Sequence, residues 1–351
     1  MVKKKCRFFK GDAPCEYHKR KGVLCNDCQH YSPVKEKILI IKLGAAGDVI
    51  RTTPILRKIK EEFPASEITW LSYFPEIMPL LVDNNYALSL ESVLILMNEK
   101  FDFLFNLDKD RIACLLAKNI RAKVKKGFIL KGGKCAPVDA DVRKSWLLGI
   151  SDNLKKKNKK TYQEEIFEIC GFKYRGERYL IELPKEFKNK KNKKKIIGLY
   201  TGCGNRWLTK RWPEKHWIAL AKSLKKKFEV RLFAGEKEDE LNKKISKVCR
   251  VRYSGYFSLK RCLEMLNEVD AVVTTDTLGL HLAIALGKKI VALFGPTSWE
   301  EIDLYGQGVK IYSSFSCLKC YKKICDVQPN CMDVILPSQV EREIKRLISL
   351  R

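Results

Sequence analysis

One stretch of the sequence, Val272 to Ser298, constrains the fold more than any other part of the chain. It reads VVTTDTLGLHLAIALGKKIVALFGPTS. A short apolar run is followed by a polar loop and then by apolar residues at helical spacing, which predict a helix over 278–286 that ends at Gly287. Residues 290–294 are continuously apolar, as is typical of a parallel strand covered on both faces. The order strand, loop, helix, strand predicts a βαβ unit of an α/β fold.

The polar residues of this unit lie where an α/β sheet usually binds its ligand. Ligands sit at the carboxyl ends of strands, and the loops 274–277 and 295–298 both follow strands. A helix that begins next to Asp276 and Thr277 offers free backbone N–H groups to an anion. The same two residues could instead only cap the helix, and His281 could be an ordinary packed histidine.

The size and charge of the chain narrow the classes of function. Its 351 residues suffice for two domains, and 69 Lys and Arg against 41 Asp and Glu give a net charge of +28. Such charge attracts nucleic acids, anionic membranes or polyanionic substrates. The lysine runs, however, are not interleaved with the aromatic residues of a nucleic-acid platform. We therefore expect mainly a solvated, lysine-rich surface and no nucleic-acid partner, and keep a nucleic-acid-binding protein that uses this charge and its cysteines as the alternative.

The expected cellular location follows from the apolar content of the segments. No run of residues has the apolar length of a membrane span, and the basic start at residues 1–5 is not followed by the apolar region of a signal peptide. We therefore expect a cytoplasmic protein, with peripheral contact at the inner face of the cytoplasmic membrane as a further option.

Eight of the fourteen cysteines fall in two tight groups. The first group lies in a polar stretch of about thirty residues that is too small to bury a core, which suits tetrahedral ligation of a structural zinc ion; disulfides and an iron–sulfur cluster stay open. Its expected ligands are Cys6, Cys15, Cys25 and Cys28, with His18 as a substitute. The second group is expected to form a weaker zinc site or to consist of buried free thiols. Its members are Cys317, Cys320, Cys325 and Cys331.

The order of apolar runs predicts two doubly wound domains. Strands expected at 38–41, 68–71 and 103–107 alternate with helical stretches in the first half, and the Gly- and Lys-rich segment 125–137 is expected to form a loop. The predicted parts are a Cys-rich module at 1–34, a first domain at 35–184, a charged linker at 185–195, a second domain at 196–335 and a C-terminal helix at 336–351, which could pack back on the first domain.

The first strand leads into a candidate catalytic turn. Gly44 and Gly47 allow a tight strand-to-helix turn, and Asp48 lies where the helix begins. The helix dipole and the free N–H groups favour the ionised form of Asp48. This carboxylate could accept a proton from an attacking hydroxyl group, or it could simply cap the helix.

Three motifs, taken in order, resemble those of glycosyltransferase family 9, the heptosyltransferase family. They are Gly-x-x-Gly-Asp at 44–48, Lys-x-Trp-Pro at 210–213, and Asp-Thr-x-x-x-His at 276–281 with Leu-Phe-Gly-Pro-Thr after it. The resemblance covers about residues 37–345. The family commonly has Gly two residues after the Asp, whereas this chain has Leu278 followed by Gly279.

The resemblance implies a fold and an activity. The fold is an α/β fold of the GT-B type, with two Rossmann-like doubly wound domains facing each other across a cleft and the small N-terminal Cys-rich metal module added to them. The activity is inverting transfer of a heptose or related sugar from an ADP-sugar donor to a lipopolysaccharide-core or other glycan or glycolipid acceptor. No catalytic divalent metal is expected. A sugar-nucleotide enzyme that transfers nothing, such as an epimerase, is the further alternative.

The resemblance also assigns roles to residues. Asp48 is the general base, Gly44 and Gly47 form the acceptor-side loop, and Lys210 holds the donor diphosphate. Thr201 offers a hydroxyl group to the donor, and Glu238 takes the ribose hydroxyl groups. The other expected donor-site residues are Gly202, Asp276, Thr277, Leu278, Gly279 and His281.

Overall fold

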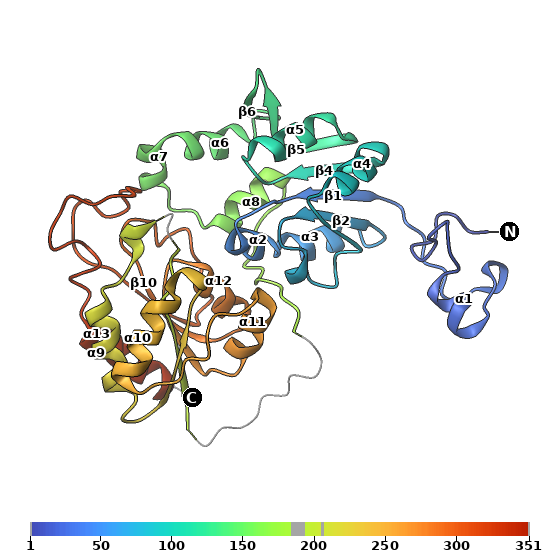
Figure 1. The fold of residues 1–351 in the computed structure, drawn as a ribbon. Coiled ribbons are helices and arrows are strands. Elements are labelled where there is room, and N and C mark those ends of the chain that lie inside the picture. Colours follow the sequence, from blue (N-terminus) through green and yellow to red (C-terminus); the bar gives the residue numbers. More distant parts are fainter. Residues whose placement is uncertain (1, 184–193, 205–206, 350–351) are drawn as a thin grey trace. The chain divides into compact units, whose positions relative to one another are not determined.

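The computed structural model describes residues 2–183, 194–204 and 207–349, which divide into two compact units (Figure 1). Unit 1 comprises residues 1–44, 54–146 and 166–173, and unit 2 comprises residues 45–53, 147–165 and 174–351. The short segment after the first strand therefore belongs to unit 2. Of the linker expected at 185–195, residues 185–193 lie outside the described residues.

Unit 1 is built on a six-stranded sheet in the order β3-β2-β1-β4-β5-β6. The first five strands are parallel, as the doubly wound prediction requires, and β6 runs antiparallel to β5. The strands are β1 (Lys37–Ile41), β2 (Glu67–Ser72), β3 (Asn84–Ala87), β4 (Lys100–Asn106), β5 (Arg121–Lys131) and β6 (Lys134–Pro137). The helices are α1 (Glu16–Lys21), α3 (Ile55–Glu62), α4 (Leu90–Asn98) and α5 (Arg111–Asn119), while α6 (Arg143–Ile150) and α8 (Tyr162–Cys170) each belong to both units.

The core of unit 1 forms because its central strands are apolar on both faces. In β1, Leu39 and Ile41 are fully buried and belong to one cluster with Leu104 of β4. Leu96 of α4 and Leu116 of α5 join the same cluster. Both helices therefore cover the same face of the sheet.

The loop prediction for residues 125–137 was wrong, because β5 and β6 form an antiparallel hairpin there. Lys131 pairs with Lys134, so Gly132 and Gly133 are the two turn residues, with φ of 55° and 73°. Turns with positive φ at both central residues match the twist of a hairpin and favour glycine. The glycines that suggested an irregular loop are thus the turn of an ordered hairpin.

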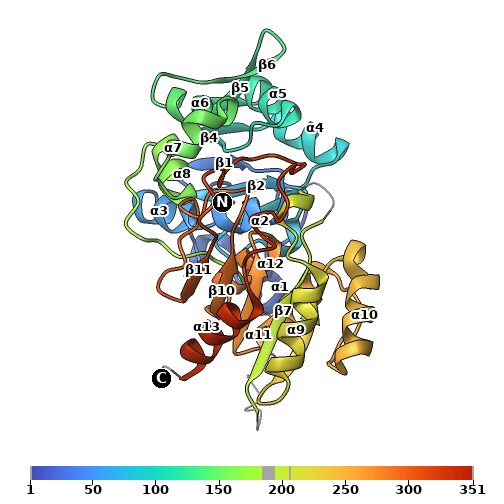
Figure 2. The same cartoon turned by 90° about the vertical axis from the view of Figure 1, so that its left-hand side faces the viewer.

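Unit 2 is built on a parallel five-stranded sheet in the order β11-β10-β9-β7-β8. The strands are β7 (Ile196–Tyr200), β8 (Glu229–Phe233), β9 (Ala271–Thr275), β10 (Lys289–Leu293) and β11 (Gly308–Ile311). The helices are α2 (Ala46–Thr52), α7 (Asp152–Lys157), α9 (Glu214–Leu224), α10 (Asp239–Cys249), α11 (Leu259–Asn267), α12 (Leu278–Ala285) and α13 (Pro337–Ser349). Figure 2 shows α9 and α10 side by side along the sheet. The βαβ unit predicted from residues 272–298 is β9, α12 and β10.

The C-terminal helix buries its apolar stripe in unit 2. Val340, Ile344 and Leu347 of α13 belong to the same core cluster as Trp212 and Trp217, whose rings meet edge to face with centroids 4.8 Å apart. Of the helices that the structure describes, none combines the length and the apolar character that a bilayer crossing requires.

Candidate active site

A buried ion pair lies at the centre of the candidate donor site. Asp276 follows β9, and its carboxylate accepts hydrogen bonds from the Lys210 ammonium group and the Thr297 hydroxyl group, each at 2.7 Å. Lys210 also donates to the backbone carbonyl of Asp276 at 3.0 Å. The two charged side chains are only 15% and 14% exposed. The tertiary structure therefore joins the Lys-x-Trp-Pro, Asp-Thr and Gly-Pro-Thr segments at one carboxylate.

The contact with Lys210 sets the charge of Asp276. Burial by itself raises the pKa of a carboxyl group, but attraction by Lys210 and His281, together with the two side-chain hydrogen bonds, outweighs it and holds the pKa of Asp276 well below its usual range. Asp276 is therefore ionised at neutral pH. It does not cap α12, because the N-cap residue is Thr277, whose side chain makes no capping hydrogen bond.

His281 is buried in α12 against the turn that precedes Asp48. The residue is 5% exposed, and a Cβ atom added at Gly47 would lie 2.6 Å from its ring. The Tyr179 hydroxyl group lies 3.5 Å from its Nδ1 atom. Burial, together with repulsion from Arg51, lowers the pKa of His281 to about 4, so the imidazole is neutral at pH 7. Gly47 is needed here because no side chain fits between α2 and α12.

Asp48 lies in the first turn of α2, as expected, next to a cation that sequence reasoning missed. Its carboxylate accepts from the Ala45 backbone N–H at 3.3 Å and pairs with the Arg51 guanidinium group at 2.8 Å. Arg51 lies over the Tyr162 ring, 3.7 Å from its centroid. The Asp48 side chain is 35% exposed and that of Arg51 is 15% exposed. The i, i+3 spacing of the two residues was the available signal for this pair.

Both candidate carboxylates act on the same histidine. The charges of Asp276 and Asp48 each raise the pKa of His281, although burial and Arg51 outweigh them. Electrostatic interactions of this kind require proximity in a partly desolvated site. The packing of α2 on α12 agrees with this, because Gly47, next to Asp48, lies against His281, and α12 begins beside Asp276.

The loop after β7 is held by Glu238. The carboxylate of Glu238 accepts from the backbone N–H groups of Gly204 at 2.9 Å and Cys203 at 3.4 Å. A Cβ atom added at Gly202 would lie 3.1 Å from the same carboxylate. Thr201 is buried and donates to the Asn242 side chain at 2.7 Å. Thr201 and Glu238 also line a cavity of about 520 Å³. The structure thus brings Thr201, Gly202 and Glu238 together.

The position of glycine in α12 has a steric cause. A Cβ atom added at Gly279 would lie 2.2 Å from the Tyr200 ring, so that no side chain fits there. The half-buried Leu278 is the first residue of the helix and meets no such limit. The shift of glycine from the first to the second helical position therefore follows from the close approach of α12 to β7.

The backbone at Gly44, the last residue of the first segment of unit 1, is held by Asp108, a second residue that the sequence motifs did not identify. The Asp108 carboxylate accepts from the backbone N–H groups of Leu43 at 3.1 Å and Gly44 at 3.3 Å and lies 3.4 Å from the Lys42 ammonium group. Asp108 closely follows β4, the parallel neighbour of β1. Its place after a strand end was the signal that could have identified it.

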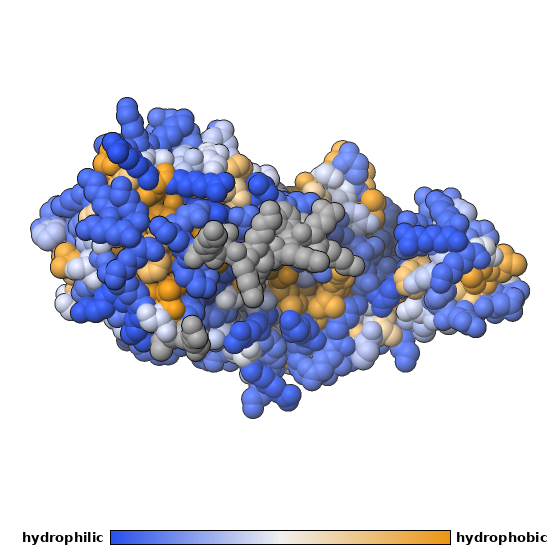
Figure 3. Space-filling model, turned by 90° about the horizontal axis from the view of Figure 1, so that it is seen from below, coloured by the Kyte–Doolittle hydropathy of each residue, from blue (hydrophilic) through white to orange (hydrophobic). Residues whose placement is uncertain are grey.

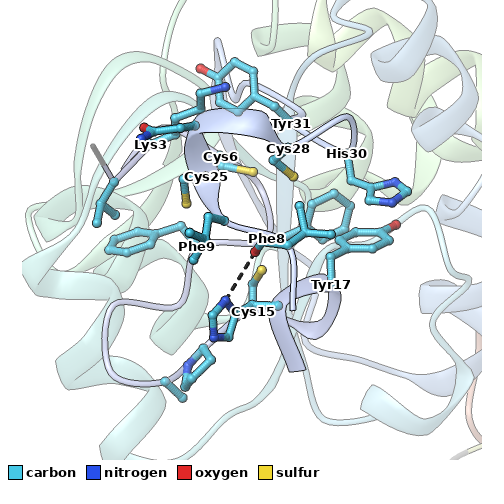
Figure 4. Close-up of a pocket in the computed structure, with 17 residues that line it drawn as sticks. Lys3, Cys6, Phe8, Phe9, Cys15, Tyr17, Cys25, Cys28, His30 and Tyr31 are labelled. Carbon is cyan, nitrogen blue, oxygen red and sulfur yellow. Dashed lines mark hydrogen bonds between the residues drawn. The ribbon is translucent and has the colours of Figure 1, made fainter. Parts of the chain in front are cut away.

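The four cysteines of the first group line one cavity of about 460 Å³ in the N-terminal module (Figure 4). The side chains of Cys6, Cys15, Cys25 and Cys28 surround the same space. All are free thiols, and across the described ranges no three or more His, Cys, Asp or Glu side chains are gathered closely enough to hold a metal ion. This module lies at the right-hand end of Figure 3, where apolar side chains are seen among the polar ones.

The second cysteine group lines a much smaller cavity in unit 2. Its volume is about 20 Å³, and Cys317, Cys320, Cys325 and Cys331 all contribute to its wall. Burial, together with the charges of the other three thiols, raises the pKa of Cys331 to about 11. The segment is tied to the Gly-Pro-Thr loop, because Lys319 donates from its backbone to the Gly295 carbonyl at 3.2 Å and Tyr321 donates to the Pro296 carbonyl at 2.8 Å.

Comparison with known proteins agrees with the motifs. The sequence profile of glycosyltransferase family 9 (heptosyltransferase) matches residues 95–330. Lipooligosaccharide heptosyltransferase 2 of Campylobacter jejuni is 28% identical over 167 residues, which are 45% of this chain and 52% of that protein. The chain thus spans about half the length of this relative.

Solved structures extend the likeness to nearly the whole chain. The glycosyltransferase family 9 structure from Veillonella parvula has a TM-score of 0.67 and 20% identity and covers 90% of this chain and 97% of that one. The ADP-heptose lipopolysaccharide heptosyltransferase II of Escherichia coli has a TM-score of 0.63 and 17% identity, with coverage of 89% and 98%. At these identities the likeness shows a shared fold.

Proposed function

Because this chain belongs to glycosyltransferase family 9, we propose that it transfers a heptose or a related sugar from an ADP-sugar to a lipopolysaccharide-core or other glycan acceptor. The observation that carries the proposal is the packing of α2 on α12, which places Gly47, next to Asp48, against the His281 ring of the helix that begins beside the Lys210–Asp276 pair. A carboxylate base close to an anion-binding lysine is what glycosyl transfer from a nucleotide-diphosphate sugar requires.

On the donor side, Lys210 and the start of α12 hold the diphosphate. The ammonium group lies against the Asp276 backbone carbonyl, next to the first N–H groups of the helix at 277–279. Free N–H groups and the helix dipole favour an anion at that point. As the bond between the anomeric carbon and the diphosphate oxygen breaks, negative charge grows on the leaving group, and Lys210 and these N–H groups stabilise it. We expect no catalytic divalent metal, because these groups supply the positive charge.

On the acceptor side, Asp48 is the general base. It is the more exposed partner of its ion pair, so that a hydroxyl group can approach it, and the positive charge of Arg51 stabilises its ionised form. Asp48 takes the proton of the acceptor hydroxyl group while the oxygen attacks the anomeric carbon and the nucleoside diphosphate departs. Attack from the face opposite the leaving group inverts the anomeric centre. His281 stays neutral and shapes the site without adding charge.

We also propose a structural metal for the N-terminal module. Residues 2–34 contain no fully buried residue, so that this stretch lacks a hydrophobic core of its own. Small domains without a core usually depend on a bound metal or on disulfides. Its four cysteines already line one cavity. We therefore propose that Cys6, Cys15, Cys25 and Cys28 bind one zinc ion, which would cross-link the module.

For the second cysteine group we propose a metal site as well, because its four thiols line one small cavity. Four thiols share the wall of a cavity of about 20 Å³, which has room for one water-sized species, and Thr209, Pro296, Phe315, Val327 and Asn330 complete the wall. A zinc ion there would fix the segment that hydrogen-bonds to Gly295 and Pro296, and so the loop that carries Thr297. Zinc content measured by plasma mass spectrometry tests both groups. We expect about one zinc ion per cysteine group. Cys25→Ser should lose only the ion of the first group, and Cys320→Ser only that of the second.

We propose the cytoplasm, at the inner face of the cytoplasmic membrane, as the place of the reaction, because a glycolipid acceptor is a membrane component. Nucleic acid is not part of the proposal, since the +28 charge is spread over the whole chain rather than concentrated with aromatic residues.

Thermal stabilisation by ADP, GDP, UDP and CDP tests the donor assignment. A nucleotide that binds the native state raises its apparent stability. We expect selective stabilisation by ADP in the wild type and none in Lys210→Ala, each compared with its own ligand-free midpoint. Stabilisation by another nucleotide would contradict the ADP assignment, and no response to any of them would contradict the donor site.

A further inference from the structure

Helix α4 of unit 1 turns most of its apolar residues to solvent. Of its nine residues, LESVLILMN, only Ser92 and Leu96 are buried. Four others are exposed to a degree unusual for apolar residues. Leu90 is 72% exposed, Leu94 53%, Ile95 43% and Met97 42%. A surface helix ordinarily directs its apolar side to the core, and exposed apolar patches often mark an interaction site. The exposed residues of α4 therefore indicate a binding surface.

The neighbouring helix continues the same surface. Ile112 and Leu115 of α5 are 47% and 44% exposed. Helices α4 and α5 contact each other, cover the same face of the sheet, and lie side by side in Figures 1 and 2. The six exposed apolar residues of the two helices are here called the α4–α5 face. They are Leu90, Leu94, Ile95, Met97, Ile112 and Leu115.

Basic side chains gather at one edge of the α4–α5 face. Arg121 donates to the Asn98 carbonyl at the end of α4, at 2.9 Å, and Lys125 donates to the Lys118 carbonyl at the end of α5, at 2.8 Å. Lys118 itself is exposed, and the side chain of Lys123 is 80% exposed. Lys118, Arg121 and Lys125 therefore border the carboxyl ends of the two helices, and Lys123, in β5 between Arg121 and Lys125, pairs with the Asp102 carboxylate at 2.7 Å.

Acidic residues flank the helices at both ends. Glu91 is in the first turn of α4, and Asp110 is the N-cap residue of α5, where its side chain accepts from the backbone. Asp110 is thus used by its own helix, and Glu99, the C-cap residue of α4, is paired with Lys37 at 3.2 Å. The surface is apolar in the middle, and Lys118, Arg121 and Lys125 carry positive charge at the carboxyl ends of the helices.

We propose that the α4–α5 face binds the surface of an anionic lipid bilayer. Apolar side chains of an interfacial helix enter the boundary between headgroups and acyl chains, and nearby Lys and Arg attract the phosphates of anionic lipids. A helix of nine residues is about 14 Å long, too short to cross a bilayer, so that α4 lies along the surface. A second copy of the chain fits less well, because it presents the same positive edge and a net charge of +28.

This inference rests on the proposed function and adds to it the surface that meets the acceptor's membrane. Unit 1 also carries Gly44, which belongs to the expected acceptor-side loop. Binding through α4 and α5 would therefore hold Gly44, one part of the acceptor-side loop, on a unit attached to the membrane in which a glycolipid acceptor resides.

Vesicle co-sedimentation tests the proposal with the full-length protein. Vesicles of phosphatidylcholine alone are compared with vesicles containing phosphatidylglycerol. The wild type should bind the anionic vesicles, and Leu94→Gln/Ile95→Gln should bind them at least about ten-fold more weakly, because it loses two inserting side chains. The matched control Val248→Gln/Leu336→Gln removes residues that are 46% and 50% exposed in unit 2 and should bind like the wild type.

A charge variant keeps the test independent of folding. Lys118→Gln changes one exposed side chain and should weaken binding roughly five-fold, with a smaller salt dependence than that of the wild type. Equal binding by the α4 variant and the wild type would overturn the proposal. A wild type that is dimeric in light scattering while the α4 variant is monomeric would also overturn it, in favour of a second copy.

Turnover with a lipid-free, water-soluble glycan acceptor separates this inference from the proposed function. The α4 variant should transfer sugar to that acceptor at the wild-type rate. Loss of vesicle binding with retained transfer supports the docking surface. A wild type that binds anionic vesicles through this face but transfers no sugar would refute the proposed function and leave the docking surface standing.

Discussion

The carboxylate of Asp48 and the guanidinium group of Arg51 lie 2.8 Å apart on α2, three residues apart in sequence. Arg51 is itself held over the Tyr162 ring, and burial leaves its side chain 15% exposed. A carboxylate whose partner is immobile loses little freedom when substrate arrives, which favours a well-oriented base. The pair therefore connects the local geometry of one helix turn with the proposed chemistry.

Asp48→Asn tests the base directly. The amide keeps the shape of the side chain but cannot accept a proton, so that turnover should fall by about 10²- to 10⁴-fold while nucleotide affinity stays at the wild-type value. Steady-state kinetics and ADP titration measure the two quantities. Unchanged turnover would show that another group is the base.

Arg51→Gln tests whether Arg51 positions that base. It removes the charge beside Asp48, and we expect kcat to fall by up to roughly a hundred-fold with little change in KM for the donor. Arg51→Lys keeps a cation and should recover part of kcat. A loss confined to KM in both variants would assign Arg51 to substrate binding instead.

The Lys210–Asp276 pair should show strong coupling in a double-mutant cycle. Lys210→Met leaves a buried carboxylate without its cation and should lower the free energy of unfolding by about 3 to 5 kcal/mol. Adding Asp276→Asn removes that uncompensated charge and should recover much of the loss. Urea unfolding at pH 7 gives the free energy of unfolding of the wild type, the two single variants and the double variant. If the losses of the two single variants simply added in the double variant, the pairing would be contradicted.

His281 should make stability depend on pH. Its pKa of about 4 lies below the value of about 6.5 for an exposed histidine, so that the unfolded chain binds more protons between these limits. Its contribution of about 3 kcal/mol is therefore complete above pH 6.5 and is lost as the pH falls toward 4. His281→Gln should lack this part of the pH dependence when the free energy of unfolding is measured at pH 7 and pH 4.5. An unchanged difference between the two pH values would place the titration elsewhere.

The two glycines of the first motif should differ in their tolerance of alanine. In Gly47→Ala the new Cβ atom lies 2.6 Å from the His281 ring, and overpacking of this kind should cost about 1 to 3 kcal/mol of stability. The matched control is Gly44→Ala, whose nearest neighbour is the Tyr73 ring at 3.5 Å, an ordinary contact. Thermal unfolding compares the two, and equal midpoints would mean that α2 and α12 separate easily.

The sequence by itself predicted the parts of this protein that depend on neighbouring residues. Continuous apolar runs identified β1 and β10, and the helix expected over 278–286 is α12 at Leu278–Ala285. The order of three motifs indicated the family. These signals are local because strand burial, helix periodicity and turn chemistry are all expressed within a few residues. The segment 125–137 was misread because glycine marks both irregular loops and the turns of hairpins.

Only the tertiary structure decided what the site residues do. Asp276 could have been a helix cap, but a lysine 66 residues earlier in the chain reaches its carboxylate and makes it part of a buried ion pair. Arg51 and Asp108 acquire their roles from the residues they meet, and α4 reveals its unusual exposure only when the core of unit 1 leaves it uncovered. A contact between two residues that are far apart in the sequence leaves no pattern in the sequence around either of them. Such contacts are therefore visible only in the folded structure.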